Sequence, residues 1–487
     1  MAATGFMARL RRSCTLDGRS LAAFRMAIGT LVTADALLRT RDVGLMFAAD
    51  GMFPAQLLRA WFADPCAWSL AACSDASWWG PFMLAAEAAA GLMLAAGCAT
   101  RWASIAAWVA AVSVLRRTAP ATNAGDGWLA CLLFWSMFLP LGGVWSWDAR
   151  SAGRAGPVRS TATVGLVLQI AVVYLAAGIS KWNACWLSGD AVRFVMSVHD
   201  HGTAWGERFV MLTDGWHRPV AWSVLALELG GPLVLLAGTG PGTRLCLVFL
   251  FAMFHVATCL LMTVGLFGPI GLASWLAIVP GEAWDRLGLP GPPAADAHAP
   301  TADRESPWAR ATCLAAGGLA ALSLLHDVTP WRHHPLPRPL ASLVNLACMH
   351  QEWGMFGEVE RQEQWAYARA ELADGAVVDL LRDGRPLETE RPAGGYTTLP
   401  HHRWHKLFWV LPRPRFRMFA PAIAAALARH WNDHHPAHRR VRVLELRAAR
   451  LGRTAADDTL HDVLLAAWPP RSEGGRGGFD RLIDAAP

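Results

Sequence analysis

Long apolar runs without charge constrain the fold of this chain more than any other feature. Residues 245–262 (LCLVFLFAMFHVATCLLM) contain one histidine and no formal charge. A helix of about 20 such residues is long enough to cross a bilayer. Across the 487 residues the apolar fraction is 54% and the charged fraction is 17%, whereas a soluble domain carries about 25% charge. We therefore predict an all-α polytopic bundle, with the lipid bilayer as its surroundings and the cell membrane as its location.

Nine segments fit the pattern of transmembrane helices. The third and the eighth are the shortest of them. The nine expected spans cover residues 21–38, 78–98, 103–118, 126–141, 162–182, 218–237, 244–263, 266–280 and 309–326.

Two arginine clusters set the predicted orientation. One precedes the first span and the other separates the fourth span from the fifth, so both fall on one side if every span crosses. The positive-inside rule makes that side cytoplasmic, which places the N-terminus in the cytoplasm and the part after nine spans outside. Arg116 and Arg117 fall on the opposite side and do not fit this rule. The clusters are Arg9, Arg11, Arg12 and Arg19, and Arg150, Arg154 and Arg159.

The character of the sequence changes after a proline-rich connector at residues 327–345. Asp374-Gly375 separates ARAEL from AVVDLL, which is a hairpin signal, and Asp383-Gly384 marks a second turn. A helix is expected over residues 418–431 and a strand over residues 441–446. The predicted boundaries are 1–326 for the transmembrane domain, 340–450 for a small α+β extracytoplasmic domain and 451–487 for a flexible tail.

Charge and cysteine content exclude some functions. The net charge of +6 comes from scattered arginines without a basic block, so nucleic acid is not expected as a partner. No CxxC motif and no His-rich spacing predicts a metal site. Five of the ten cysteines lie in or at the ends of spans, where cysteine behaves as a small apolar residue. One disulfide is compatible with the four cysteines of the outer segments, which are Cys66, Cys73, Cys185 and Cys348.

Lysine is almost absent from the chain, and this singles out Lys181. Of the 44 basic residues, only Lys181 and Lys406 are lysines. Lys181 follows the apolar run that contains Tyr174, two helical turns away on the same face. Arginine keeps its proton, whereas a partly desolvated lysine can lose it, so Lys181 is a candidate base. The alternative is an interfacial lysine that reaches water beside Trp182 and Trp186.

Other polar residues lie inside or at the ends of spans, where they are costly and suggest function by default. Glu228, His255 and Glu87 are central in their spans. Asn123 and Asp126 open the fourth span, on the same outer side as the candidate base. Each has a structural alternative: the glutamates can be protonated or bonded to a neighbouring helix, the histidine can be a packing residue, and the last two can cap a helix.

Several segments resemble one known family. The stretch Tyr174–Gly189 (YLAAGISKWNACWLSG) resembles the segment around the catalytic lysine of vitamin K-dependent γ-glutamyl carboxylase and of its bacterial relatives, the horizontally transferred transmembrane domain family. SLAAFRMAIGTLVTADA (Ser20–Ala36) is similar to the first span of that family, and FHVATCLLMTVGLF (Phe254–Phe267) to its Phe-His span. GCATRWAS and FWSMFLPLGGVWSWDA also fit, and QEWGMF (Gln351–Phe356) resembles the domain after the spans. The likeness covers residues 17 to 450.

The resemblance implies a base-initiated reaction on reduced vitamin K or menaquinol, with Lys181 as the base and His255 in a supporting role. In the animal enzyme, oxygen adds, the quinone leaves as an epoxide and carbon dioxide traps a glutamyl carbanion, without a metal. A membrane quinol is therefore the expected cofactor, and a peptide or protein is a further candidate substrate. The candidate cofactor-binding residues are Tyr174, Asn123, Asp126 and Glu228.

Two departures from the animal enzyme bear on the activity. Its Asn-His pair before the fourth span is absent, because Ala124 follows Asn123, and its propeptide-binding region is not recognisable here. Chemistry on a quinol is thus better supported than carboxylation of a protein. The alternative is a non-enzymatic protein that acts with a partner in peptide toxin maturation or immunity, or that binds lipid or peptide. A transporter would show paired spans broken by Gly or Pro, and we find none in the sequence.

Overall fold

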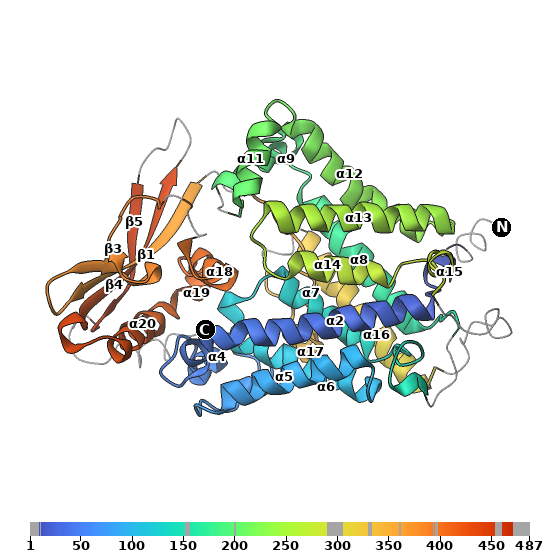
Figure 1. Cartoon of the computed structure of the whole chain (residues 1–487), viewed down its shortest axis with the longest axis horizontal. Coiled ribbons are helices and arrows are strands. Elements are labelled where there is room, and N and C mark those ends of the chain that lie inside the picture. Colours follow the sequence, from blue (N-terminus) through green and yellow to red (C-terminus); the bar gives the residue numbers. More distant parts are fainter. Residues whose placement is uncertain are drawn as a thin grey trace.

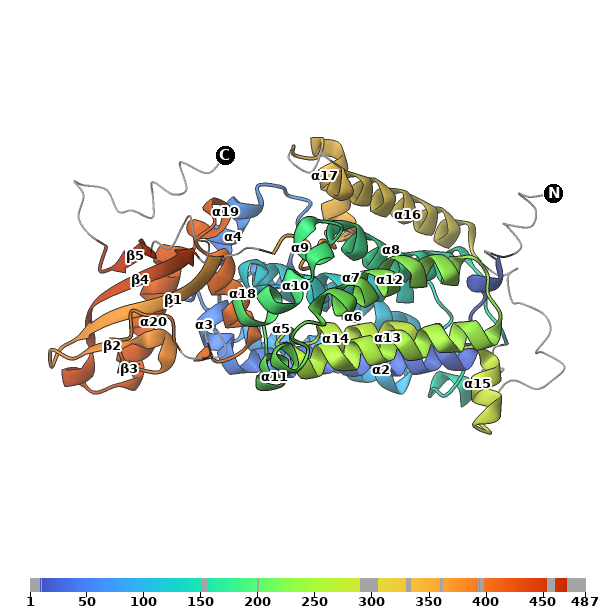
Figure 2. The same cartoon turned by 90° about the horizontal axis from the view of Figure 1, so that it is seen from above.

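The computed structural model describes residues 9, 11–150, 156–198, 201–289, 305–329, 334–359, 362–392, 394, 398–452 and 460–470. Helices form an elongated bundle, and a small sheet with its own helices lies against one end of it (Figure 1). The long helix α2 runs from the end farthest from the sheet to the end beside it (Figures 1 and 2). The fold is therefore a mostly helical bundle with a separate α+β unit, as the sequence predicts.

Each of the nine predicted spans contains a helix. Among the described helices, six are long and apolar enough to cross a membrane, namely α2, α5, α8, α12, α13 and α16. The other three are shorter or less apolar, so nine crossings stay a prediction. The nine helices are α2 (Gly18–Arg39), α5 (Trp79–Ala96), α6 (Thr100–Arg117), α7 (Ala124–Ser136), α8 (Thr161–Ser180), α12 (His217–Leu236), α13 (Pro241–Leu261), α14 (Phe267–Leu276) and α16 (Pro307–Val328).

Shorter helices join these nine at the two ends of the bundle. They are α3 (Val43–Phe47), α4 (Ala55–Phe62), α9 (Ala184–Ser188), α10 (Asp190–Arg193), α11 (Ala204–Leu212), α15 (Gly281–Arg286) and α17 (Arg338–Ala347).

Glycines set how closely the first two long helices pack. A Cβ atom at Gly29 would lie 2.5 Å from the backbone nitrogen of Ala95, and one at Gly91 would lie 2.6 Å from Oγ1 of Thr33. Neither helix could approach the other this closely with a larger residue at these positions. Small residues of this kind are typical of helix contacts in membranes.

The arginine clusters that set the predicted orientation lie at one end of the bundle. Leu16 and Val158, which border the two clusters, pair in an antiparallel bridge. Arg154 lies outside the described residues. Arg116 and Arg117 lie at the other end, where both are buried and donate hydrogen bonds to backbone carbonyls of neighbouring segments. Their role in packing accounts for their position against the positive-inside rule.

The C-terminal unit is a five-stranded antiparallel sheet in the order β3-β2-β1-β4-β5. The Asp374-Gly375 turn joins β1 to β2, and Asp383-Gly384 leads into β3, as predicted. The expected helix over residues 418–431 is α20. The elements are β1 (Gln362–Leu372), β2 (Val377–Asp379), β3 (Arg385–Pro386), α18 (His402–Val410), α19 (Pro414–Arg417), α20 (Ala420–His434), β4 (Val441–Gly452) and β5 (Leu460–Trp468).

Strand β5 corrects the flexible tail predicted over residues 451–487. It pairs with β4 along the register from Leu444↔Trp468 to Leu451↔Leu460. Its first half is exposed and only its second half contributes buried residues such as Leu465, so an alternating pattern was not apparent. The Gly-rich end, residues 471–487, lies outside the described residues.

The C-terminal unit shares a hydrophobic core with the bundle. Phe408 and Phe419 of that unit are fully buried in the same cluster as Phe47 and Phe53 from the connection between α2 and α5. The rings of Phe53 and Phe419 meet edge to face with centroids 5.9 Å apart. Since apolar area buried in this way is the main favourable term in folding, the two parts pack as one body at this end.

Candidate functional site

Lys181 and Glu228 form a buried ion pair between α8 and α12. Lys181 lies directly after the last residue of α8, and its Nζ donates to Oε1 and Oε2 of Glu228 at 3.0 Å each. Both residues are 4% exposed. A Cβ atom at Gly178 would lie 2.8 Å from the side chain of Leu229, so this glycine lets the two helices come close enough for the pair. An interfacial anchor would have its amine in water, and this amine does not.

The amine of Lys181 has two further contacts. Nζ lies 3.4 Å from the backbone oxygen of Ala177 and 5.5 Å from the ring centroid of Trp186. The ring of Trp186 is held in turn, because its Nε1 donates to the backbone oxygen of Phe356 at 2.7 Å. The QEWGMF segment, whose Gln351 and Trp353 are buried against the bundle, thus supports the position of the lysine.

Tyr174, His255 and Trp275 form a second polar group, deeper along α8. The hydroxyl of Tyr174 lies 2.6 Å from Nε2 of His255, and Nε1 of Trp275 donates to the same hydroxyl at 2.8 Å. All three residues are buried. Nδ1 of His255 is buried without a hydrogen-bond partner among the described residues. The histidine therefore has one polar atom left for a ligand.

A glycine and two aromatic rings define the space around His255. A Cβ atom at Gly271 would lie 2.1 Å from Cε1 of the imidazole, so the ring rests directly on the backbone of α14. Trp128 and Phe267 pack on other sides, with ring centroids 6.0 and 5.9 Å from that of His255. His255 and Glu228 are both buried in the bundle interior.

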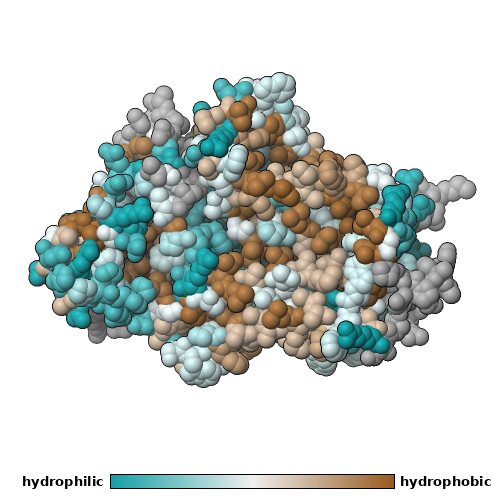
Figure 3. Space-filling model, in the orientation of Figure 1, coloured by the Kyte–Doolittle hydropathy of each residue, from teal (hydrophilic) through white to brown (hydrophobic). Residues whose placement is uncertain are grey.

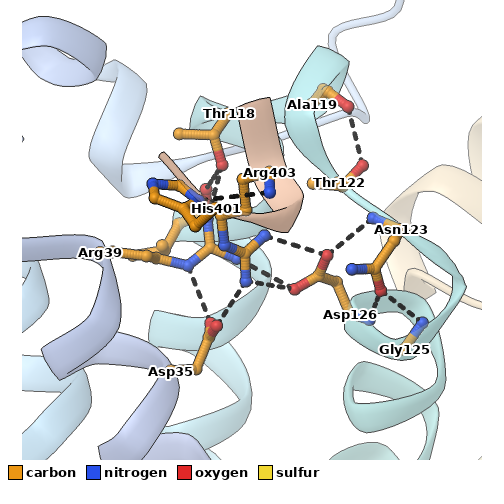
Figure 4. Close-up of polar contacts among 11 residues, drawn as sticks. Asp35, Arg39, Thr118, Ala119, Thr122, Asn123, Gly125, Asp126, His401 and Arg403 are labelled. Atoms are coloured by element: carbon orange, nitrogen blue, oxygen red, sulfur yellow. Dashed lines mark hydrogen bonds and ion pairs between the residues drawn. The ribbon is translucent and has the colours of Figure 1, made fainter. Parts of the chain in front are cut away.

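Asn123 and Asp126 belong to a third group. They form a capping box at the start of α7: the side chain of Asn123 accepts from Gly125 N at 2.8 Å, and Asn123 N donates to Asp126 Oδ2 at 2.7 Å. Asp126 also binds Arg39 at 3.1 Å and Arg403 at 2.8 Å (Figure 4). These bonds support the capping alternative for both residues.

The ion network around Asp126 connects the bundle with the C-terminal unit. Arg39 and Asp35 come from α2, Asp126 comes from α7, and Arg403 comes from α18 (Figure 4). Arg403 bridges the two carboxylates, since it binds both Asp35 and Asp126. Burial alone would lower the pKa of Arg403, but the two carboxylates raise it, so this arginine stays charged.

Lys181 and the Asn123–Asp126 turn line neither of the two hollows that the structure describes. One cavity, of about 610 Å³, lies between the segment around Gly202 and the C-terminal sheet. A second hollow, of about 520 Å³, is an apolar groove between α2 and α14. Lys181 lines neither of them. The groove lies on a face of the bundle that is mostly hydrophobic, whereas the sheet end is mostly hydrophilic (Figure 3).

Some contributors to these groups were missed from the sequence. Trp275 and Trp128 do not stand out in the sequence, because the chain has 25 tryptophans. Arg403 was missed because it belongs to the C-terminal unit, far from the spans in sequence. A signal for Arg39 existed, since Asp35 precedes it by one helical turn at the end of a span.

Metal and disulfide chemistry find no support in the described part of the chain. No three His, Cys, Asp or Glu side chains come together there as metal ligands. None of Cys66, Cys73, Cys185 and Cys348 forms a disulfide with another. Cys348 is buried against Val112 and Ala130, on the bundle side of its helix.

Most of the residues described above lie in a region that matches a known family model. The HTTM domain model matches residues 14–282, which is more than half of the chain. The chain belongs to the HTTM family. The match includes Lys181, Glu228 and His255, whereas α16 and the whole C-terminal unit follow the HTTM domain. The chain matches no curated protein and no solved structure. It is thus an HTTM protein of the membrane, related to the carboxylase family.

Proposed function

We propose that Lys181 acts as a general base on a lipid-soluble acid, and that this acid is a reduced quinone such as reduced vitamin K or menaquinol. The buried pair of Lys181 and Glu228 is the observation that supports the proposal. Charged residues inside membrane proteins are costly, and they mark functional sites by default. The resemblance around Lys181 adds support, since the matching lysine of the carboxylase family is the base.

The pair gives the amine a way to lose and regain its proton. A buried ion pair is costly to desolvate, and moving the shared proton onto Glu228 removes both charges. The neutral amine of Lys181 can then accept a proton from an acidic hydroxyl, so that an O–H bond breaks and an N–H bond forms. The ammonium that results lies against Ala177 O and the ring of Trp186. Glu228 is therefore a positioning residue and proton partner in this proposal.

The group around His255 has the chemistry to contact an aromatic ring that carries oxygen atoms. Nδ1 of His255 offers an unused polar atom, and Trp128 and Phe267 offer aromatic faces. Tyr174 holds the histidine through Nε2. The reduced quinone supplies the acidic hydroxyl and reacts with oxygen once that hydroxyl is deprotonated. Use of carbon dioxide, as in the animal enzyme, is a further part of the proposal.

The proposal is tested by Lys181→Arg in purified protein supplied with reduced menaquinone or a vitamin K analogue under oxygen. We expect epoxide formation to fall about 10²- to 10⁴-fold, the usual cost of removing a general base. Arginine keeps the charge but cannot accept the proton, because its pKa stays above about 12. Lys406→Arg, at the second lysine of the chain, is the matched control and should keep full activity. Full activity in Lys181→Arg would overturn the proposal.

A second candidate is a binding protein for a basic peptide partner. The cavity of about 610 Å³ is lined by Glu207, Glu363 and Glu390, with Trp365 beside them. Arg391 lines it too and binds Glu363 at 2.8 Å, so the acidic groups are in excess. Binding of an arginine-rich fluorescent peptide should weaken at least tenfold in Glu207→Lys/Glu390→Lys. Equal binding by the wild type and this variant would exclude the cavity as the peptide site.

A further inference from the structure

Glu87 is a buried acid that the proposed chemistry does not use. It lies in the middle of α5 and is 0% exposed, and neither of its carboxyl oxygens has a hydrogen-bond partner among the described residues. An isolated carboxylate in such a place is far more costly than a neutral acid, and the group takes a proton instead. Glu87 can therefore be charged only if a positive group nearby is free to compensate it.

The charged groups near Glu87 already compensate one another. They are Asp35 and Arg39 from α2, Asp126 from α7 and Arg403 from α18. Arg39 binds Asp35 at 2.8 Å and Asp126 at 3.1 Å, and Arg403 binds both carboxylates. Two carboxylates and two guanidinium groups sum to a formal charge of zero (Figure 4). No excess positive charge remains for an ionised Glu87.

Arg403 is the one member of this network that the transmembrane helices do not carry. It belongs to α18, which follows the sheet strands β1 to β3. Without the charge of Arg403, the buried charged groups would be Asp35, Asp126 and Arg39, with a formal charge of −1. One proton taken up by a carboxylate would restore neutrality.

We propose that Glu87 and the Asp35–Arg39–Asp126–Arg403 network form a buried proton-binding site whose proton occupancy is coupled to the charge of Arg403. Glu87 carries a proton while Arg403 is in place. Asp35 or Asp126 takes up a second proton from water when the charge at position 403 is removed. The charge balances, since one proton replaces one guanidinium. This site is independent of the quinol chemistry proposed for Lys181.

Infrared spectroscopy of the full-length protein in lipid nanodiscs tests the first half of this proposal. A protonated carboxylic acid has a carbonyl stretch above the amide I band, which a carboxylate lacks. We expect the wild type to show this band. In Glu87→Gln the intensity of the band should fall by the contribution of one carboxylic acid. Glu207→Gln, at an exposed acid, is the control and should leave the band unchanged. Identical spectra of the wild type and Glu87→Gln would show that Glu87 is ionised and would overturn the proposal.

Replacing Arg403 tests the coupling. Arg403→Gln removes the charge and should gain a second carboxylic acid band, also in the background of Glu87→Gln. Arg403→Lys keeps the charge with a poorer fit, and it should gain no band. If the lysine variant gains the same band, the loss of packing rather than of charge is responsible, and the coupling fails. It also fails if a folded Arg403→Gln protein gains no band.

Discussion

Lys181 and Glu228 are far apart in sequence, and folding brings their charged atoms within 3.0 Å. Each is buried, so each depends on the other for compensation of its charge. This makes the pair a measurable part of the stability of the bundle, apart from any activity. A buried pair has little net stabilising effect, but loss of one partner leaves an uncompensated charge.

Glu228→Gln should therefore lower the free energy of unfolding by about 3–5 kcal/mol, the usual effect of breaking a buried pair. The double variant Lys181→Met/Glu228→Leu should recover most of this loss, because no buried charge remains. Denaturant unfolding of the purified protein in detergent measures both effects.

The exposed pair of Asp50 and Arg429, at 3.6 Å, provides the control. Asp50→Asn should change the stability by less than about 1 kcal/mol, as is usual for surface pairs. A double variant that is less stable than Glu228→Gln would contradict the assignment of Lys181 and Glu228 as a pair.

Candidate functional residues could be predicted from the sequence more readily than the contacts between them. Lys181 was found because lysine is so rare in this chain, and Glu228 and His255 because each interrupts an apolar span. Their partners depend on how helices are arranged around α8, and no periodic pattern encodes that arrangement. Asn123 and Asp126 were predicted to contact a cofactor, whereas the structure places them in a cap and an ion network. The position of these two residues at the start of a span also predicts a helix cap, which was the structural alternative.

At the scale of helices, glycines decide where polar side chains can lie. Gly271 leaves room for the imidazole of His255 against α14, and Gly178 lets α8 pack close to α12. Some other helix glycines face open space. Nothing lies within 4 Å of a Cβ atom at Gly230 of α12.

Gly271→Ala should destabilise the protein by about 1–3 kcal/mol, the usual cost of extra atoms in a well-packed interior. The new methyl group would overlap the ring of His255, so that either the ring or α14 must shift. Gly230→Ala is the matched control on an open face, and it should be neutral or stabilising by up to about 1 kcal/mol. Comparison of the two melting temperatures checks the prediction, and equal shifts would show that the His255 contact is not tight.

Helices and strands differed in how far the sequence could define them. Each apolar span contains a helix, and six of these helices are long and apolar enough to cross a membrane. Length and hydropathy could be predicted because they are properties of each segment alone. The DG turns predicted the β1–β2 hairpin for a similar reason. Strand β5 was missed because its exposed first half has no apolar alternation, and it is a strand only through pairing with β4.

At the scale of the whole molecule, the sheet lies at the end where α2 finishes and α7 begins (Figures 1 and 2). The arginine clusters that the structure describes lie at the other end. The positive-inside rule therefore predicts that the sheet lies outside the cytoplasm.

Fusions at the C-terminus test this orientation. Alkaline phosphatase, which is active only outside the cytoplasm, should be active when fused after Pro487, and green fluorescent protein in the same place should stay dark. Fusions at the N-terminus should give the reverse for the fluorescent protein. A bright C-terminal fusion would contradict the orientation, and bright fusions at both termini would mean an even number of crossings.

The shared core of bundle and sheet has a consequence for how the protein is made. Phe47 and Phe53 leave the ribosome early, whereas Phe408 and Phe419, which cover them, are among the last residues synthesised. Until Phe408 and Phe419 are made, the apolar surface around Phe47 and Phe53 therefore has no cover from the C-terminal unit. A chain that stops before α18 would keep that surface uncovered, and we expect proteases to degrade it faster than the full-length chain.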